Sequence, residues 1–270
     1  GEPGYEEREN ILNGLDTAAK SGFTDVAVNS NTSPFLDTKA SIAYLKSLST
    51  FKTTNLYPIG SLTRNSKGKE MADLYDMKTA GAIAFGDYNS ASSNDNLMKI
   101  ALQYAQNFDG LVVSFPLNNA IGGEGIAHEG VNSTYLGLKG IPSLAEEMQI
   151  SRDLFILEYT GGKLHIPTIS TAKSVDLIKE AKNKIFVEYE QAKNNYQLAI
   201  RNYNNAQNQL DLATRIEKKN KIKFFEGLAS SFDLRQAQVQ LFNRQQNYIL
   251  SMKDIVSKKT ALDIIINNPK

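Results

Sequence analysis

Cysteine and tryptophan are absent from this 270-residue chain, and histidine occurs only twice. Without cysteine there can be no disulfides and no thiolate metal site, and two histidines limit any site built from imidazole. Lysine plus arginine (30) nearly equal aspartate plus glutamate (29), so the charge gives no reason to expect nucleic acid or an anionic membrane as a partner. No run approaches the roughly 20 apolar residues of a membrane-spanning helix. The chain opens without a signal peptide, and its lack of an initiator methionine suggests an N-terminal truncation.

Glycine and proline are concentrated in the first two thirds of the chain. Of 18 glycines and 7 prolines, only Gly227 and Pro269 lie beyond residue 184. Up to Lys182 the pattern is one of repeated strand–helix units, and from Ile185 onward it is one of two long helices joined by a turn. The sequence therefore predicts two parts, an α/β part over residues 1–183 and an all-α part over residues 184–270.

In the first part, short β-branched runs alternate with amphipathic stretches, which is typical of βαβ units on a parallel sheet. Strands are predicted over residues 24–28, 56–60, 82–85, 111–115 and 164–169. Helices are predicted over residues 38–48, 69–79, 94–107, 142–159 and 174–182, with a glycine-rich loop over 120–140. About five βα units are too few to close an eight-stranded barrel. We expect a partial (β/α) barrel, or alternatively an open doubly wound sheet, although no phosphate-binding glycine motif follows any strand.

Six short motifs follow one another in this part. They are EPGYE at 2–6 with AAKSGFTDV at 18–26, NSNTSP at 29–34, PIGSLT at 58–63, AGAIAFGD at 80–87, LGLKGIP at 136–142 with AEE at 145–147, and LHI at 164–166 with ISTA at 169–172. In this order they resemble the dihydroorotase family of the amidohydrolase superfamily, over residues 1 to about 183. The resemblance implies hydrolysis and closure of a cyclic amide in pyrimidine biosynthesis, by a metal-activated water at the strand ends.

The resemblance also implies metal ligands that this sequence lacks. The family's first-strand His-x-His pair would fall just before Gly1, which itself stands where many relatives have a substrate-gripping arginine. The family's His-x-x-His-Val-Ser-Thr pattern begins here at His165, so Thr168 occupies a metal-ligand position. A threonine hydroxyl is a poor substitute for imidazole, and one or two ligands cannot hold zinc. We expect a catalytically silent segment without a cofactor, with zinc only if the barrel is active.

Three residues of this part, Asp87, His165 and Asn31, remain site candidates. Asp87 follows a predicted strand and is the candidate catalytic and metal-binding carboxylate, or else a helix-capping or loop acid. His165 is a candidate metal ligand, or a buried, hydrogen-bonded strand residue. Asn31 is a candidate for binding a substrate amide or carboxylate, although Asn-Thr-x-Pro is also ordinary turn chemistry. His128, in the glycine-rich loop, is expected to be exposed.

Apolar and small residues of the second part recur at alternating steps of three and four, as in a coiled coil. The first run is Tyr189, Ala192, Tyr196, Ala199, Tyr203, Ala206, Leu210 and Ala213. The second run is Leu234, Ala237, Leu241, Tyr248, Met252, Ile255 and Leu262. Gly227 suits a helix C-cap, and Ser230 with Asp233 resembles a capping box. We therefore expect an antiparallel hairpin with arms of roughly 35 residues, about 50 Å long.

The segment KFFEGLASSFDL at 223–234, followed by AQVQL at 237–241, resembles the outer-membrane efflux (TolC-like) family over residues 185–268. The resemblance implies that the turn binds a periplasmic adaptor protein through Gly227, Leu228, Ser230 and Ser231. The alternative is a generic helical hairpin or coiled-coil dimerisation arm.

The two resemblances belong to different compartments, and no Pro/Gly/Ser linker separates them. The first implies the cytoplasm and a carbamoyltransferase partner, and the second implies the periplasm or outer membrane and a homo-oligomer or adaptor contact. Our main hypothesis is a chimeric or truncated reading frame in which neither activity survives. The alternatives are an active metal-dependent cyclic-amide hydrolase and an efflux-channel component that binds an adaptor.

Overall fold

The computed structural model describes residues 1–50 and 52–267. The chain divides into two compact units, the first over Gly1–Lys182 and the second beginning at Asn183. The division lies close to the point where glycine and proline become rare in the sequence. We describe each unit by itself.

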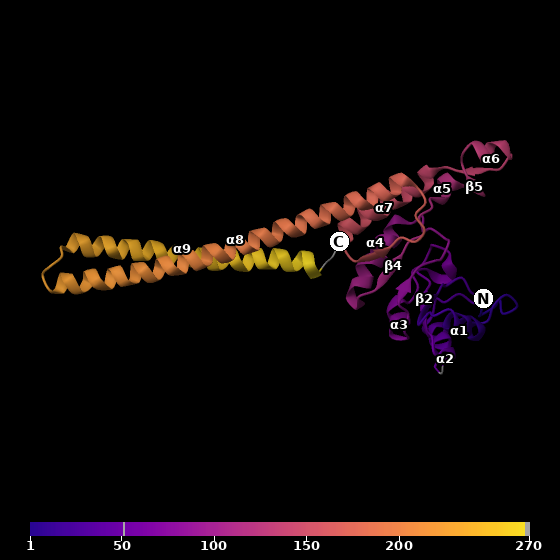
Figure 1. The fold of residues 1–270 in the computed structure, drawn as a ribbon, viewed down its shortest axis with the longest axis horizontal. Coiled ribbons are helices and arrows are strands. Elements are labelled where there is room, and N and C mark those ends of the chain that lie inside the picture. The colour runs from indigo at the N-terminus through magenta and orange to yellow at the C-terminus, as the bar shows by residue number, and fades with distance from the viewer. Residues whose placement is uncertain (51, 268–270) are drawn as a thin grey trace. The chain divides into compact units, whose positions relative to one another are not determined.

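The first unit contains a five-stranded parallel sheet (Figure 1). Its strands, in spatial order, are β1 (Asp25–Val28), β2 (Asn55–Gly60), β3 (Ala84–Phe85), β4 (Leu111–Val113) and β7 (Lys163–His165). Among the described residues, β1 and β7 each have one strand neighbour, so this sheet is open. The predicted partial barrel-like sheet is therefore confirmed.

Helices pack against one face of this sheet. The longer ones are α1 (Ile11–Lys20), α2 (Lys39–Leu48), α4 (Asp95–Ala105) and α7 (Ser143–Thr160). Phe85 and Val112 are register partners on β3 and β4, and Leu56 lies four residues before Gly60, the β2 partner of Phe85, so all three share this face and belong to the buried core. The sequence also determines where helices begin. Asn10, Thr38 and Asn94 each accept a backbone N–H bond at a helix start, as N-cap residues do.

Two predicted elements of the first unit are much longer than the observed ones. The helix predicted over 69–79 is only α3 (Leu74–Thr79), because the preceding residues pair back on the loop after β2 through a Thr63–Met71 bridge. The strand predicted over 164–169 ends at His165, since Pro167 has no N–H to donate and Thr168 has a left-handed φ of 54°.

The predicted glycine-rich loop over 120–140 contains regular structure. It includes α5 (Asn119–Gly122), β5 (Ala127–His128) and α6 (Val131–Tyr135), and β6 (Gly140–Ile141) follows as the parallel partner of β5. The Asn118 side chain starts α5 by accepting bonds from two backbone N–H groups. Two short 3-10 helices, η1 (Arg64–Ser66) and η2 (Gln106–Phe108), complete the unit.

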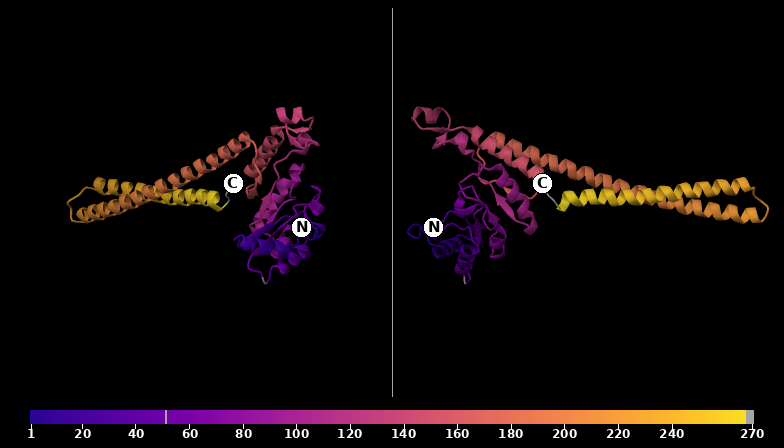
Figure 2. Two further views of the ribbon diagram at one scale, coloured as in Figure 1. Left: turned by 45° about the vertical axis from the view of Figure 1, so that its right-hand side comes forward. Right: turned by 180° about the vertical axis from the view of Figure 1, so that it is seen from behind.

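The second unit consists of α9 (Ser231–Asn267) and most of α8 (Ala172–Phe225), which lie side by side (Figure 2). The helix predicted over 174–182 does not end separately, because α8 continues through it. The Tyr203 and Tyr248 hydroxyls lie 2.9 Å apart, and Arg244 Nη1 donates to Gln209 Oε1 at 2.8 Å. No described helix carries an apolar stretch that could span a bilayer.

Burial along the two helices follows the predicted three-four spacing. Ala199, Ala213 and Ala237 are buried, and nearly all other residues of the two predicted runs are half-buried. Met252 is the exception, with 45% of its surface exposed, so its placement in the seam is wrong. Its neighbour Ser251 is half-buried instead.

The turn between α8 and α9 has the predicted chemistry. Gly227 has a φ of 75°, which glycine adopts without strain, and the Leu228 N–H donates back to the Lys223 carbonyl at 2.8 Å. Ser230 and Asp233 form reciprocal bonds, because Ser230 N donates to Asp233 Oδ2 at 3.0 Å and Asp233 N donates to Ser230 Oγ at 3.2 Å. The predicted capping box is confirmed.

Candidate functional site

Asp87 lies immediately beyond β3, at the carboxyl edge of the sheet, where (β/α)-barrel sites are built. Its side chain is buried, and both of its oxygens are occupied by one residue. Thr63 N donates to Oδ1 at 3.0 Å, and Thr63 Oγ1 donates to Oδ2 at 2.5 Å. Burial raises the pKa of Asp87, and the bonds from Thr63 act in the opposite direction. Asp87 therefore fixes the loop after β2, and neither carboxylate oxygen is left without a protein donor.

The ends of β1 and β3 are joined at the same edge. The buried Ser30 hydroxyl donates to the Gly86 carbonyl at 2.7 Å. Gly86 has no space for a side chain, because an added Cβ would lie 2.7 Å from Val113 Cβ on β4. Close contact between the strand ends thus excludes a side chain at Gly86, next to Asp87.

A second carboxylate, Glu146 on α7, accepts bonds from both residues that precede α8. Its oxygens accept from the backbone N–H and the hydroxyl of Ser170 and of Thr171, with Thr171 N at 2.9 Å. Burial acts to raise the pKa of Glu146, but the hydrogen bonds from Ser170, Thr171 and Ser174 outweigh it and hold the pKa below its ordinary value. An ionised carboxylate here also faces the positive end of a long helix. Glu146 therefore anchors the start of α8.

Replacing Glu146 with glutamine is expected to lower the free energy of unfolding by about 2 kcal/mol at neutral pH, because a charge-assisted network is lost. The folded-state pKa is lower than the unfolded value of 4.5. The ionised group therefore stabilises the fold above that unfolded value, and this contribution disappears as the pH falls through the folded-state pKa. Urea denaturation at about pH 7 and about pH 3 should show a difference between the two proteins that shrinks with acid.

The neighbouring Glu147→Gln variant is the control for this experiment, because Glu147 forms a long ion pair with Lys173 at 3.7 Å. It should lose less stability than Glu146→Gln at neutral pH. An equal loss for Glu146→Gln at both pH values would show that the carboxylate charge does not act as described.

Glu146 also lines a cavity of about 360 Å³ next to the ends of β4 and β7. The other polar side chains that line it are His128, Ser143, Thr168, Ser170 and Thr171, among apolar residues that include Phe115, Leu117 and Ile141. His128 is exposed, as predicted. The cavity therefore presents hydroxyls, one imidazole and one carboxylate that is already hydrogen-bonded.

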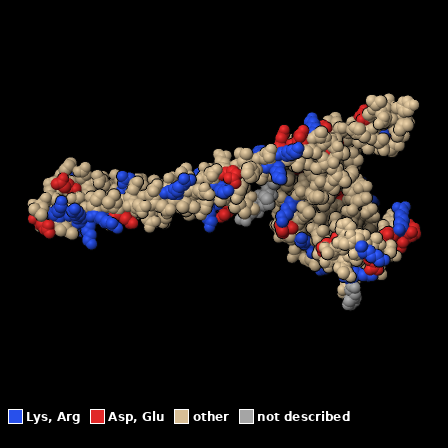
Figure 3. Space-filling model, in the orientation of Figure 1, with Lys and Arg blue, Asp and Glu red and all other residues tan. Residues whose placement is uncertain are grey.

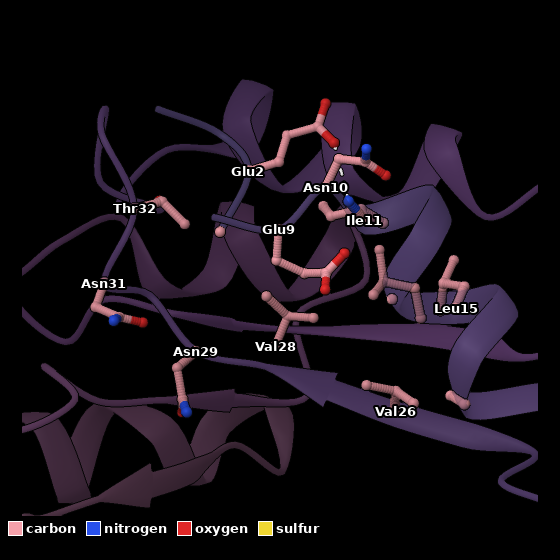
Figure 4. Close-up of a pocket in the computed structure, with 14 residues that line it drawn as sticks. Glu2, Glu9, Asn10, Ile11, Leu15, Val26, Val28, Asn29, Asn31 and Thr32 are labelled. Carbon is pink, nitrogen blue, oxygen red and sulfur yellow. Dashed lines mark hydrogen bonds between the residues drawn. The ribbon is translucent and has the colours of Figure 1, made fainter. Parts of the chain in front are cut away.

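Asn31 lines a different cavity, of about 210 Å³, between α1 and β1 (Figure 4). Its amide and the Glu9 carboxylate both point toward the space beside Val28 (Figure 4). Glu2 also lines this cavity and accepts a bond from Ile11 N at 3.0 Å. Two carboxylates and no lysine or arginine line the cavity, so it is unsuited to an anionic substrate group.

His165 is exposed at the end of β7, opposite Val113 in the sheet. The prediction that it is a buried strand residue is therefore wrong. It lines neither of the two cavities, so the structure does not bring it together there with Asn31, His128 or Thr168.

The zinc centre that the fold family implies does not fit these donors. Within the described residues, no group of three or more His, Cys, Asp or Glu side chains is arranged to hold a metal ion. The carboxylates of Asp87 and Glu146 are both committed to hydroxyl and backbone N–H donors. Thr168 supplies a hydroxyl where imidazole would be needed.

The sequence reasoning missed a third carboxylate near the strand ends. Asp153 on α7 is 1% exposed and accepts from Ser114 Oγ at 2.6 Å and from Arg152 Nη2 at 2.6 Å. Arg152 also donates to the Ser92 carbonyl at 2.6 Å. Burial raises the pKa of Asp153 above its ordinary value, although the Arg152 guanidinium acts to lower it. This network joins α7 to β4 and to the loop before α4.

A parallel sheet flanked by helices, with polar side chains gathered at its carboxyl edge, is the arrangement of the (β/α)-barrel class. Residues 1–174 match the family described as Dihydro-orotase-like. This match covers more than half of the chain, and the chain therefore belongs to that family.

Individual relatives agree with this assignment. The dihydroorotase of Pelotomaculum thermopropionicum is 48% identical over 181 residues, which cover 67% of this chain and 42% of that protein. The dihydroorotase of Ruminiclostridium cellulolyticum is 43% identical over 184 residues, covering 68% of this chain and 43% of that protein. The chain thus spans less than half the length of these curated relatives.

A solved structure shows the same fold. The L-hydantoinase (dihydropyrimidinase) from Arthrobacter aurescens superposes with a TM-score of 0.50 at 18% identity, over 63% of this chain and 39% of the other. The chain therefore shares the fold of part of that structure over 63% of its own length.

Proposed function

We propose that the first unit is a dihydroorotase-like barrel segment that does not hydrolyse cyclic amides. The observation that carries this proposal is the state of Asp87, the best candidate for a site carboxylate. Both of its oxygens are taken up by Thr63, and the end of β4 closes over the neighbouring Gly86. A carboxylate held in this way positions the loop after β2, and each of its oxygens already accepts a hydrogen bond from Thr63.

Thr168, at a position where the family pattern has a metal-binding histidine, supports the same proposal. Thr168 stands where the family pattern has histidine, in a cavity whose single carboxylate anchors α8. The named relatives are dihydroorotases, but the chain spans only 42–43% of their length. Their activity therefore does not transfer to this chain on similarity alone.

For the second unit we propose an antiparallel coiled-coil hairpin of the kind found in TolC-like channel proteins, joined to the barrel segment as a chimera. The Tyr203–Tyr248 and Gln209–Arg244 contacts support antiparallel pairing, since the residue number on α8 rises from the first contact to the second while the residue number on α9 falls. Buried alanines at Ala199, Ala213 and Ala237 support close approach of the helices. The turn residues Gly227, Leu228, Ser230 and Ser231 lie at the end of this hairpin.

Metal binding tests the proposal for the first unit. The full chain is equilibrated with zinc, passed through a desalting column and measured by atomic emission. We expect no stoichiometric zinc, and the same background in Asp87→Ala, because the donors do not form a metal centre. The proposal would be contradicted if the parent chain retained zinc in proportion to protein and Asp87→Ala lost it. Asp73→Ala, which alters an exposed ion pair, would then have to retain zinc as the parent does.

A further inference from the structure

Two tyrosines of the second unit lie against each other across its two helices. The ring of Tyr203 on α8 and the ring of Tyr248 on α9 have centroids 5.3 Å apart and planes inclined by 32°. Their hydroxyl oxygens are only 2.9 Å apart, so the phenol ends approach more closely than the ring centres do. The Cε carbons, which flank the hydroxyl-bearing carbon of each ring, therefore lie at the end where the two rings converge.

This pairing is particular to these two residues. Of the ring contacts among the described residues, it is the only one between two tyrosines. Tyr189 and Tyr196 belong to the same predicted run as Tyr203 and are half-buried as it is, yet neither takes part in such a contact. The pair therefore depends on the presence of Tyr248 opposite Tyr203, and not on the three-four spacing alone.

Few charged side chains accompany the pair. Residues 245–252 contain none, and residues 202–214 contain only Asp211. Charged side chains gather instead at the turn end of the unit (Figure 3). The two hydroxyls are hydrogen-bonded to each other, and both tyrosines are half-buried and so remain in contact with solvent. The two phenols are thus held together at a place that a soluble oxidant can reach.

We propose that Tyr203 and Tyr248 form a site of oxidative crosslinking, at which a peroxide-driven one-electron oxidant joins them as dityrosine. Each phenol gives up one electron and its hydroxyl proton, which leaves two phenoxyl radicals. A carbon–carbon bond then forms between one Cε of each ring. Each of these carbons loses its hydrogen as a proton, and each phenol oxygen takes a proton back. The pair loses two electrons and two protons in all, which convert one hydrogen peroxide into two waters.

The product is a covalent link between α8 and α9. A crosslink between distant positions lowers the entropy of the unfolded chain, as a disulfide does, and so stabilises the folded form. The buried apolar side chains described in this unit are three alanines, Ala199, Ala213 and Ala237, so packing alone holds the two helices together weakly. This inference depends neither on the catalytic state of the first unit nor on the resemblance of the second to channel proteins.

Peptide mapping after oxidation tests the proposal. The full chain is treated with hydrogen peroxide and a haem peroxidase at micromolar protein concentration and then digested with trypsin. The tryptic peptide 202–215 contains Tyr203 as its only tyrosine, and the peptide 245–253 contains Tyr248 as its only tyrosine. Mass spectrometry should find these two peptides joined with the loss of two hydrogens.

The amount of this product distinguishes the pair from tyrosines that meet by chance. Tyr135 and Tyr159 are 88% and 77% exposed and provide the comparison. The joined peptides should be at least about tenfold more abundant than any linked pair that includes either of them, because neighbours held within one chain react at a high effective concentration. For the same reason, the yield per chain should not change when the protein is diluted roughly tenfold.

Two phenylalanine variants test the assignment. Tyr248→Phe keeps the ring and removes the phenol, so the joined peptides should disappear. Tyr196→Phe is the matched control, because Tyr196 is half-buried in the same predicted run, and it should crosslink as the parent does. Circular dichroism before oxidation confirms that both variants are folded. After oxidation, thermal unfolding of the helices should occur at a higher temperature in the parent and be unshifted in Tyr248→Phe.

Three results would overturn the proposal. The first is absence of the link between Tyr203 and Tyr248 under conditions that convert free tyrosine to dityrosine. The second is a yield per chain that falls in proportion to dilution, which would place the link between two chains. The third is an equal loss of the link in Tyr196→Phe and Tyr248→Phe.

Discussion

Replacing Asp153 with alanine is expected to lower the free energy of unfolding of the first unit by about 3–5 kcal/mol, because it removes the buried carboxylate that pairs with the Arg152 guanidinium. Asp153 is 1% exposed, and its carboxylate receives bonds from Arg152 and from Ser114. Without it, the Arg152 guanidinium, whose side chain is only 19% exposed, keeps one weaker ion pair with Asp95 at 3.2 Å. The buried Ser114 hydroxyl also loses its acceptor.

Urea denaturation of the full chain measures this loss, and hydrogen exchange on peptides from residues 1–182 assigns it to the first unit. Asp73→Ala is the matched control, because Asp73 forms an ion pair with Arg64 in which both side chains are 55% exposed. Such surface pairs contribute about 0–1 kcal/mol. Equal losses in the two variants would show that burial of the Asp153 network is not what stabilises the unit.

Phe85→Ala is expected to cost about 3–5 kcal/mol, since it removes a large side chain from a closed core. Phe85 is fully buried, and its ring packs edge-on against Phe108 with a centroid distance of 6.0 Å. β3 has only two residues, Ala84 and Phe85, so this ring is the main apolar anchor of the strand that leads to Asp87. We expect faster hydrogen exchange at the Thr63 and Gly86 amides in the same variant.

The same experiment on Phe155→Ala provides the control, because this phenylalanine of α7 is 74% exposed. Its removal should change the free energy of unfolding by no more than about 0.5 kcal/mol. A small loss for Phe85→Ala would indicate that the core around β3 refills the space and that β3 does not depend on this ring.

The sequence predicted the positions of the strands because burial on a parallel sheet selects short apolar, β-branched runs. Its predictions at the Ser230–Asp233 capping box and at Gly227 were correct for a related reason, since capping chemistry is decided by residues three or four apart. The three-four spacing of the helical unit likewise agrees with its burial, except at Met252.

Tertiary contacts explain most of what the sequence did not predict. Residues 69–72 are not helical because Met71 pairs with Thr63, and nothing local indicates this pairing. The glycines of the 120–140 segment predict a loop, although β5 pairs with β6 on the other side of α6. In such cases a contact distant in the chain overrides local propensity.

The candidate site was predictable only in part. Asp87 could be placed at a strand end from its position after an apolar run, but its two donors both come from Thr63, 24 residues earlier. Glu146 stood within a recognised motif, yet its role depends on Ser170 and Thr171. The hydrogen bond from Ser114 to Asp153 joins residues 39 positions apart, and no sequence pattern predicts it.

An assay of dihydroorotate hydrolysis by the full chain, with and without added zinc, tests most directly the proposal that the barrel segment has no catalytic activity. We predict no turnover above the uncatalysed rate in either condition, and no difference between the parent chain and Asp87→Ala. Zinc-dependent turnover that disappears in Asp87→Ala and survives in Asp73→Ala would contradict the account, because it would require a working metal centre at the strand ends.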